Sequence, residues 1–122
     1  MNDKAPLSER FTLVLLSHNR KAFMRRTLQY YSTYPCSILV LDSSLEADES
    51  LAQLYPQVDY RHLPQFSYKG LQDKLTYGMS LVTTPYMAFA ADDDFLLHDA
   101  LTSSLEFLEA HPDYGLCHGY GM

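Results

Sequence analysis

The sequence predicts an α/β protein in which helices cover both faces of a mainly parallel sheet. Short apolar runs alternate with segments whose apolar residues recur every three or four positions. This alternation is typical of strands that are joined by crossover helices. Prolines follow the helix-like segments and precede the strand-like ones, and they are Pro35, Pro56, Pro85 and Pro112. Because proline cannot continue a helix, each one separates a helix from the next strand.

The first half of the chain contains two strand–helix units. Residues 11–16 form an apolar run and are expected to be the first strand. Asn19 is expected to cap a helix over residues 20–31, since asparagine accepts backbone N–H groups at helix starts. The second strand is expected over residues 37–41, and a helix over residues 45–55 follows it. The apolar residues on one face of this second helix are Ala47, Leu51 and Leu54.

The middle of the chain contains a weaker strand and a longer helix. Residues 58–62 are expected to form the third strand, and residues 65–68 a loop. A helix follows over residues 69–82, and we expect its apolar stripe to face the core. This stripe consists of Leu71, Leu75, Met79 and Val82.

The last third of the chain repeats the pattern. The fourth strand is expected over residues 86–91, which are almost entirely apolar. Asp99 is expected to cap a helix over residues 100–110, and residues 114–118 are expected to begin a fifth strand. The inward residues of this helix are expected to be Leu101, Leu105 and Leu108.

Length and composition limit the classes of function. The chain has 122 residues, so we expect a single domain over residues 1–122. Its formal net charge of −6 argues against a nucleic-acid partner, because such surfaces neutralise phosphates with Lys and Arg. No apolar run approaches a membrane span, and the N-terminal segment lacks an apolar signal core, so a cytoplasmic location is expected. Cys36 and Cys117 are too few for a disulfide framework and are expected to be small buried side chains.

Polar side chains follow three of the predicted strands. The carboxyl ends of parallel strands open on the same edge of a sheet, where α/β proteins bind their ligands. We therefore expect these three groups to converge. They are Ser17, His18, Asn19 and Arg20; Asp42 with Ser43 and Ser44; and Asp92, Asp93 and Asp94.

The three consecutive acids have two interpretations. Adjacent carboxylates repel one another near a sheet edge, so they require a cation or hydrogen-bond donors, and their oxygens suit Mn²⁺ or Mg²⁺. A nucleotide fits this edge, since Asp42 can accept from a base N–H or a ribose hydroxyl while a metal bridges the diphosphate. The alternative is a solvated acidic turn that caps the next helix. Asn19 can equally be only a helix cap, and Asp42 only the start of a turn.

Three segments resemble one known family. They are FTLVLLSHNR at residues 11–20, CSILVLDSS at residues 36–44 and PYMAFAADDDF at residues 85–95. In this order and spacing they resemble the nucleotide-binding half of a GT-A fold glycosyltransferase of family 2, with PYMAFAADDDF resembling the strand that enters the metal-binding DXD motif. The resemblance implies a Rossmann-like three-layer α/β/α fold of the nucleotide-diphospho-sugar transferase type.

The resemblance also implies residue roles. Asp42 would contact the nucleobase, with Ser17, His18, Asn19 and Arg20 packing around the base and ribose. Asp92 and Asp94 would be the two acids of the DXD motif, meeting the ribose and the metal-bound diphosphate, with Asp93 between them. The family pattern more often starts its first acid one residue earlier, where this chain has Ala91.

The helix that follows Gly70 departs from the family. Many relatives carry an Arg-Asn pair where this chain has Leu75 and Thr76. Lys74 could supply the missing positive charge to the diphosphate. Its alternative interpretation is an exposed helix lysine with no role in binding.

The implied activity is the metal-dependent transfer of a sugar, with inversion, from a nucleoside-diphosphate sugar to an acceptor. The expected donor is a UDP-sugar, and the acceptor is an unknown glycan, lipid or protein. The general base is expected outside this chain. Two alternatives stay open. The first is a non-catalytic α/β nucleotide- or metal-binding module. The second is a nucleotidyltransferase, which ranks lower because residues 17–21 contain no glycine-rich phosphate loop.

Three further expectations concern regions at and beyond the C-terminal end of this sequence. The resemblance implies a second, acceptor-binding half, so the chain is expected to be truncated. Truncation would expose apolar surface, so self-association through residues 114–120 is expected. Regions beyond this chain are also expected to bring the protein to the inner face of a membrane.

Overall fold

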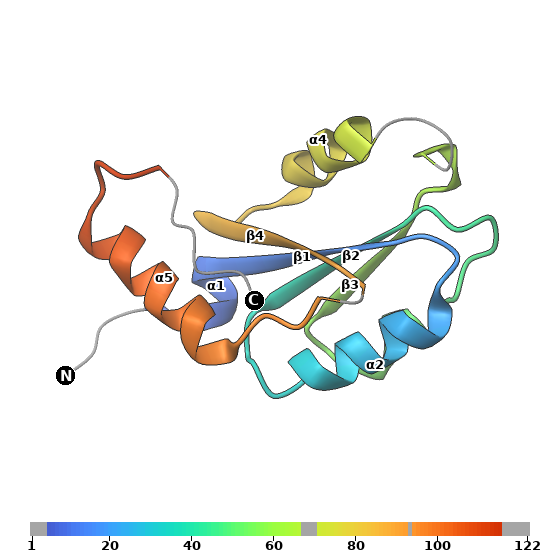
Figure 1. Ribbon diagram of the computed structural model, residues 1–122, viewed down its shortest axis with the longest axis horizontal. Helices are drawn as coiled ribbons and strands as arrows, with labels where there is room; N and C mark the ends of the chain where they lie inside the picture. Colours follow the sequence, from blue (N-terminus) through green and yellow to red (C-terminus); the bar gives the residue numbers. More distant parts are fainter. Residues whose placement is uncertain (1–4, 67–70, 93, 116–122) are drawn as a thin grey trace.

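A parallel four-stranded sheet forms the centre of the molecule (Figure 1). The computed structural model describes residues 5–66, 71–92 and 94–115. The strands, in spatial order, are β3 (Val58–His62), β2 (Ser37–Asp42), β1 (Phe11–Ser17) and β4 (Tyr86–Ala91). All three neighbouring pairs are parallel. The prediction of a mainly parallel sheet is therefore confirmed, and the four strands lie within one residue of their predicted bounds.

Helices cover both faces of this sheet, which confirms the three-layer α/β/α architecture. Figure 1 shows α2 on one face and α4 on the other. The helices are α1 (Leu7–Arg10), α2 (Lys21–Tyr31), α3 (Leu51–Leu54), α4 (Leu71–Leu81) and α5 (His98–Ala110), with a 3₁₀ turn at Pro64–Phe66. The short helix α1 was not predicted.

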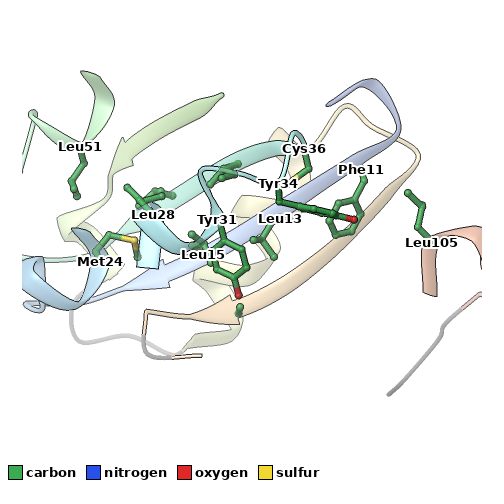
Figure 2. Packing of buried hydrophobic residues seen from close by; sticks show 13 residues of the cluster. Phe11, Leu13, Leu15, Met24, Leu28, Tyr31, Tyr34, Cys36, Leu51 and Leu105 are labelled. Carbon is green, nitrogen blue, oxygen red and sulfur yellow. The ribbon is translucent and has the colours of Figure 1, made fainter. Parts of the chain in front are cut away.

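Alternation along the strands divides the core into two clusters, one on each face. The larger cluster lies between the sheet and α2, where Leu13 and Leu15 of β1 pack with Leu28 and Tyr31 (Figure 2). The smaller cluster lies on the α4 face and contains Val14, Leu39, Leu41 and Leu63. Strands that are buried on both faces are expected for a parallel sheet, which explains their continuous apolar runs.

The predicted helix over residues 45–55 is wrong for most of its length. Only Leu51–Leu54 is helical, and residues 45–50 contain a bend and a turn but no helix. Asp48 accounts for this difference. Its carboxylate accepts from Arg25 at 3.1 Å and also from Ser50, and its backbone N–H donates to the Tyr60 hydroxyl at 2.9 Å. Such side-chain contacts offer the backbone an alternative to helix.

Neither predicted helix cap is correct. Arg20 and Leu97 occupy the N-cap positions of α2 and α5, and neither makes a side-chain cap hydrogen bond. Asp99 instead lies in the first turn of α5. Asn19 has a φ of 54°, which asparagine tolerates better than most residues. Its side-chain oxygen does not cap α2, because Oδ1 accepts from Leu45 N in the loop after β2 at 3.3 Å.

The predicted core stripe of α4 is wrong at Leu71 and Met79, whereas Val82, which follows the helix, packs against the smaller cluster. Leu71 is 60% exposed and Met79 is 55% exposed. The buried residues of α4 are Lys74 and Gly78. A Cβ added to Gly78 would lie 2.4 Å from Leu41 Cδ1, so α4 presents a small residue to the sheet and comes close to β2. The helix is thus rotated from the orientation that its apolar stripe predicts.

The remaining predictions concern the fifth strand, the two cysteines and membrane-spanning segments. Tyr114 and Gly115 are not in a strand, and the rest of the predicted fifth strand lies outside the described residues. Cys36 is fully buried as expected, and burial raises the pKa of its thiol to about 12. Cys117 lies outside the described residues. Within the described ranges, no helix has the length and apolar character needed to cross a membrane.

Candidate functional site at the carboxyl edge of the sheet

The strand register brings the predicted site residues to one edge of the sheet. Ser17, the last residue of β1, is the partner of Asp42, the last residue of β2. On the other side of β1, Leu16 is the partner of Ala91, and Asp92 follows directly. The expected convergence of these three groups is therefore present in the structure. It follows from the parallel arrangement of β2, β1 and β4.

Asp92 is a buried carboxylate that is held by the loop after β1 and by α2. Only 3% of its surface is exposed. Its Oδ2 accepts from Ser17 Oγ at 3.4 Å, and its Oδ1 lies 3.3 Å from Arg20 Nη1. Thr27 Oγ1 of α2 donates to the backbone oxygen of Asp92. The ion pair gives this carboxylate a positive partner that reaches the surface, because the Arg20 side chain is 41% exposed.

Asp42 is also buried, but neutral donors bind its two oxygens. Its Oδ1 accepts from Ser44 N at 2.9 Å, and its Oδ2 accepts from the Tyr60 hydroxyl at 2.6 Å. Burial and the hydrogen bond to Asp42 both raise the pKa of Tyr60 above its ordinary value. The hydroxyl therefore stays protonated and donates to the carboxylate. Asp42 in turn holds the loop that follows β2.

The loops after β1 and β2 are bound to each other. His18 Nδ1 lies 3.0 Å from Ser43 Oγ, and Asn19 N donates to Ser44 Oγ at 2.6 Å. Both His18 and Asn19 are exposed. An open hollow of about 420 Å³ lies beside them. Its lining residues are Asn19, Lys21, Ser44, Leu45 and Glu46.

Lys74 reaches the same edge from α4. It is only 5% exposed, so its interpretation as an exposed helix lysine is wrong. Its Nζ donates to Ser17 O at 2.8 Å and to Ser43 Oγ at 3.0 Å. Burial lowers the pKa of Lys74, and the nearby charges of Asp42 and Asp92 act in the opposite direction. The sequence did not reveal this burial, because Leu71 and Leu75 indicated a different inward face.

The acidic residues fit a metal only as part of a larger ligand set. Asp94 is exposed, and its Oδ2 accepts from Ala91 N at 3.2 Å. Asp93 lies outside the described residues. Among the residues that the structure describes, no three His, Cys, Asp or Glu side chains form a metal-binding group. Mg²⁺ usually takes one or two carboxylates together with substrate phosphates. Asp92 and Asp94 would therefore complete a metal site only if a diphosphate supplied the remaining ligands.

Two residues that hold the site were not predicted. Tyr60 lies in β3 opposite Val40 and reaches Asp42 only because β3 pairs with β2. Tyr31 of α2 donates to the backbone oxygen of Asp94 at 3.2 Å and accepts from Leu96 N at 2.8 Å. Both tyrosines occupy positions where an apolar residue is equally expected, so no sequence signal distinguished them.

These features define a class of α/β domain whose ligands bind outside the carboxyl ends of parallel strands. Within this class, the model of glycosyl transferase family 2 matches residues 12–121, so the chain belongs to that family. A search of the curated proteins found no match. The four-stranded parallel sheet agrees with the Rossmann-like GT-A fold of the family. Membership implies, in general terms, a nucleotide-sugar donor and an acceptor.

Proposed function

We propose that this chain is the donor-binding part of a metal-dependent glycosyltransferase that takes its sugar from a UDP-sugar and transfers it with inversion. The acceptor is a glycan, a lipid or a protein. One observation supports this most directly. Asp42, Asp92 and the loop from Ser17 to Arg20 share the carboxyl edge of the sheet, in a chain whose family uses nucleotide sugars.

The exposed part of this edge would bind the nucleoside. The hollow beside Asn19 and Ser44 is large enough for part of a nucleotide. Asp42 and the Ser17 to Arg20 loop would meet the base and ribose. Asp42 also holds the loop beside the hollow, because it accepts from the backbone N–H of Ser44, which lines the hollow. Arg20 brings a positive charge to the boundary between the buried Asp92 and solvent.

The acids after β4 would serve the diphosphate. Asp92 and Asp94 would hold Mn²⁺ or Mg²⁺ and meet the ribose and the metal-bound diphosphate. When bound, the metal is a Lewis acid that stabilises negative charge on the nucleoside diphosphate as it leaves. Arg20 would orient Asp92, and Tyr31 would orient the backbone at Asp94. The base that deprotonates the acceptor would come from outside this chain.

A ligand screen by thermal unfolding tests the proposal. Ligands that bind only the native state raise the melting temperature with the logarithm of their excess over Kd. We expect UDP with Mn²⁺ or Mg²⁺ to raise it, and UDP without metal to raise it less. Inorganic pyrophosphate with the same metal is the control for charge alone. The proposal fails if none of UDP, GDP, ADP and CDP shifts the melting temperature with either metal.

A further inference from the structure

Lys74 is a buried lysine that joins two strand ends. Its Nζ donates to the backbone oxygen of Ser17 at 2.8 Å and to Ser43 Oγ at 3.0 Å. Ser17 ends β1, and Ser43 directly follows the last residue of β2. One ammonium group of α4 therefore connects the starts of the two loops that border the proposed donor site.

The atoms that accept from Lys74 also take part in contacts within these loops. Ser17 O accepts from Ser43 N at 3.0 Å and from Ser43 Oγ at 3.3 Å. Ser43 Oγ also lies 3.0 Å from His18 Nδ1. Because Lys74 donates to Ser43 Oγ, the hydrogen of that hydroxyl is left for Ser17 O or the imidazole. Loss of the ammonium group would therefore disturb both loops at once.

The charge of Lys74 is balanced inside the protein. A buried ammonium is costly unless it has hydrogen-bond acceptors and opposite charges nearby. Protein oxygens accept from Nζ in two hydrogen bonds, and the carboxylates of Asp42 and Asp92 favour its charged form. Only 5% of the residue is exposed. These contacts satisfy the ammonium within the protein, without a diphosphate.

The approach of α4 to the sheet sets the reach of Lys74. Gly78 lies one turn further along the same buried face of α4. A Cβ there would come within 2.4 Å of Leu41 Cδ1, so glycine allows the helix to lie close over β2. The short distance between α4 and β2 lets the lysine reach the strand ends.

We propose that Lys74 is a positioning residue that fixes the Ser17 to Asn19 and Ser43 to Ser44 segments where the donor nucleoside binds, without contacting the diphosphate. The inference rests on the proposed function for the identity of its ligand. A positioning lysine affects binding of the parent nucleoside and of the diphosphate by the same factor. A lysine that contacts phosphate affects only the diphosphate.

The test compares uridine and UDP, each with Mg²⁺, by NMR titration of the 122-residue chain. If the screen identifies another nucleoside diphosphate, that compound and its nucleoside replace them. We expect Lys74→Met to weaken both ligands by the same factor, about tenfold or more, as for the loss of a charged hydrogen bond. Arg61→Met, which removes an exposed positive charge on β3, is the control and should change neither affinity more than twofold. Weakened UDP binding with unchanged uridine binding overturns the inference.

A second readout needs no ligand. Amide hydrogen exchange at Ser43 N, which donates to Ser17 O, should become about tenfold faster in Lys74→Met, while exchange at Val40 in β2 stays unchanged. Unchanged exchange at Ser43 overturns the inference about Lys74, whether or not a nucleotide binds. If no nucleotide binds, the proposed function fails independently of this result. If Lys74→Met does not fold, Ser43→Ala takes its place, because it removes the Oγ that accepts from Lys74. It should weaken the nucleoside and the diphosphate by the same factor, and this factor should be smaller than that expected for Lys74→Met.

Discussion

Asp42 and Asp92 are buried carboxylates at one edge of the sheet, and their direct partners differ in charge. Asp92 pairs with the guanidinium of Arg20, whereas Asp42 accepts from Ser44 and from the hydroxyl of Tyr60. A buried carboxylate that loses one of its donors keeps its desolvation cost without compensation. The stability of the loop after β2 therefore depends on neutral hydrogen bonds, and Tyr60 provides one of them from a different strand.

Tyr60→Phe is expected to lower the free energy of unfolding by about 1–3 kcal/mol, because it leaves a buried acceptor unsatisfied. The substitution removes the donor to Asp42 Oδ2 and the acceptor of Asp48 N. Urea unfolding at pH 7 measures the change. Tyr55→Phe is the matched control, since Tyr55 is a half-buried tyrosine that packs against the same core cluster. Equal stability of the two variants would contradict the role of the Tyr60 hydroxyl.

Asp94→Asn is expected to leave folding intact and to remove the part of the UDP-induced melting shift that depends on metal. The side chain is exposed, and an amide oxygen can still accept from Ala91 N. An amide is a weaker ligand for Mg²⁺ than a carboxylate because it carries no charge. Thermal unfolding with UDP, with and without metal, measures the effect. Asp59→Asn, which changes an exposed carboxylate on β3, is the control. If the metal-dependent part of the melting shift survives in Asp94→Asn, Asp94 has no role in metal binding.

The strands and the two long crossover helices were predictable from local pattern, whereas the orientation of α4 was not. A strand whose residues are all apolar is buried only in a sheet that is covered on both faces, so β1, β2 and β4 follow directly from the sequence. The apolar stripe of α4 indicated the wrong face. Tertiary contacts overrode it, because the hydrogen bonds of Lys74 and the close approach at Gly78 turn a neighbouring face of the helix towards the sheet.

The location of the candidate site was predictable, but the environment of each residue was not. Position at a strand end follows from the order of elements, and Asp42 and Asp92 are where parallel pairing places them. Burial depends on contacts that are distant in sequence. Tyr60 reaches Asp42 and Lys74 reaches Ser17 only after the chain has folded. The roles of these residues in donor and metal binding stay predictions.

Gly78→Ala tests how closely α4 approaches the sheet. Alanine favours helix by about 1 kcal/mol over glycine, so an unconstrained site would gain stability. Here the new Cβ would meet Leu41 Cδ1, a side chain that is fully buried and must move. We expect a net loss of about 1 kcal/mol or more in the free energy of unfolding. Ser80→Ala, on an exposed position of the same helix, should show no loss, and a more stable Gly78→Ala would show that α4 is not packed closely.

At the scale of the whole molecule, the protein and its proposed donor carry charges of the same sign. The chain carries a formal charge of −6, and the proposed donor is also anionic. The net charge of the protein therefore does not attract the donor over a long range, and cations close to the site must provide the attraction. Lys21 lines the hollow, Arg20 pairs with Asp92 at the edge of the sheet, and a divalent metal would add the largest local charge. This balance is the physical reason to expect that donor binding depends strongly on metal.

The molecule also buries several weak acids, which makes its stability sensitive to alkaline pH. Burial raises the pKa of Tyr31 and of Cys36 to about 12, and it raises the pKa of Tyr34 and Tyr60 in the same direction. Below about pH 8 these groups are protonated in the folded and unfolded chains alike, so they do not change stability. Between about pH 8 and pH 12 the unfolded chain loses their protons first, beginning with the Cys36 thiol, and their contribution to stability falls as pH rises.

Cys36→Ala isolates one contribution to this fall. Each group that titrates only in the unfolded chain lowers the free energy of unfolding by about 1.4 kcal/mol per pH unit. Removal of the thiol should therefore reduce the slope by about this amount above pH 9, whatever constant loss the smaller side chain causes. The lowered pKa of Lys74 acts in the opposite direction, but it is common to both proteins and cancels in the comparison. Urea unfolding at pH 8, 9.5 and 10.5 gives the two slopes. Parallel slopes would mean that Cys36 releases its proton equally easily in the folded and unfolded chains, which a fully buried thiol against the sheet does not allow.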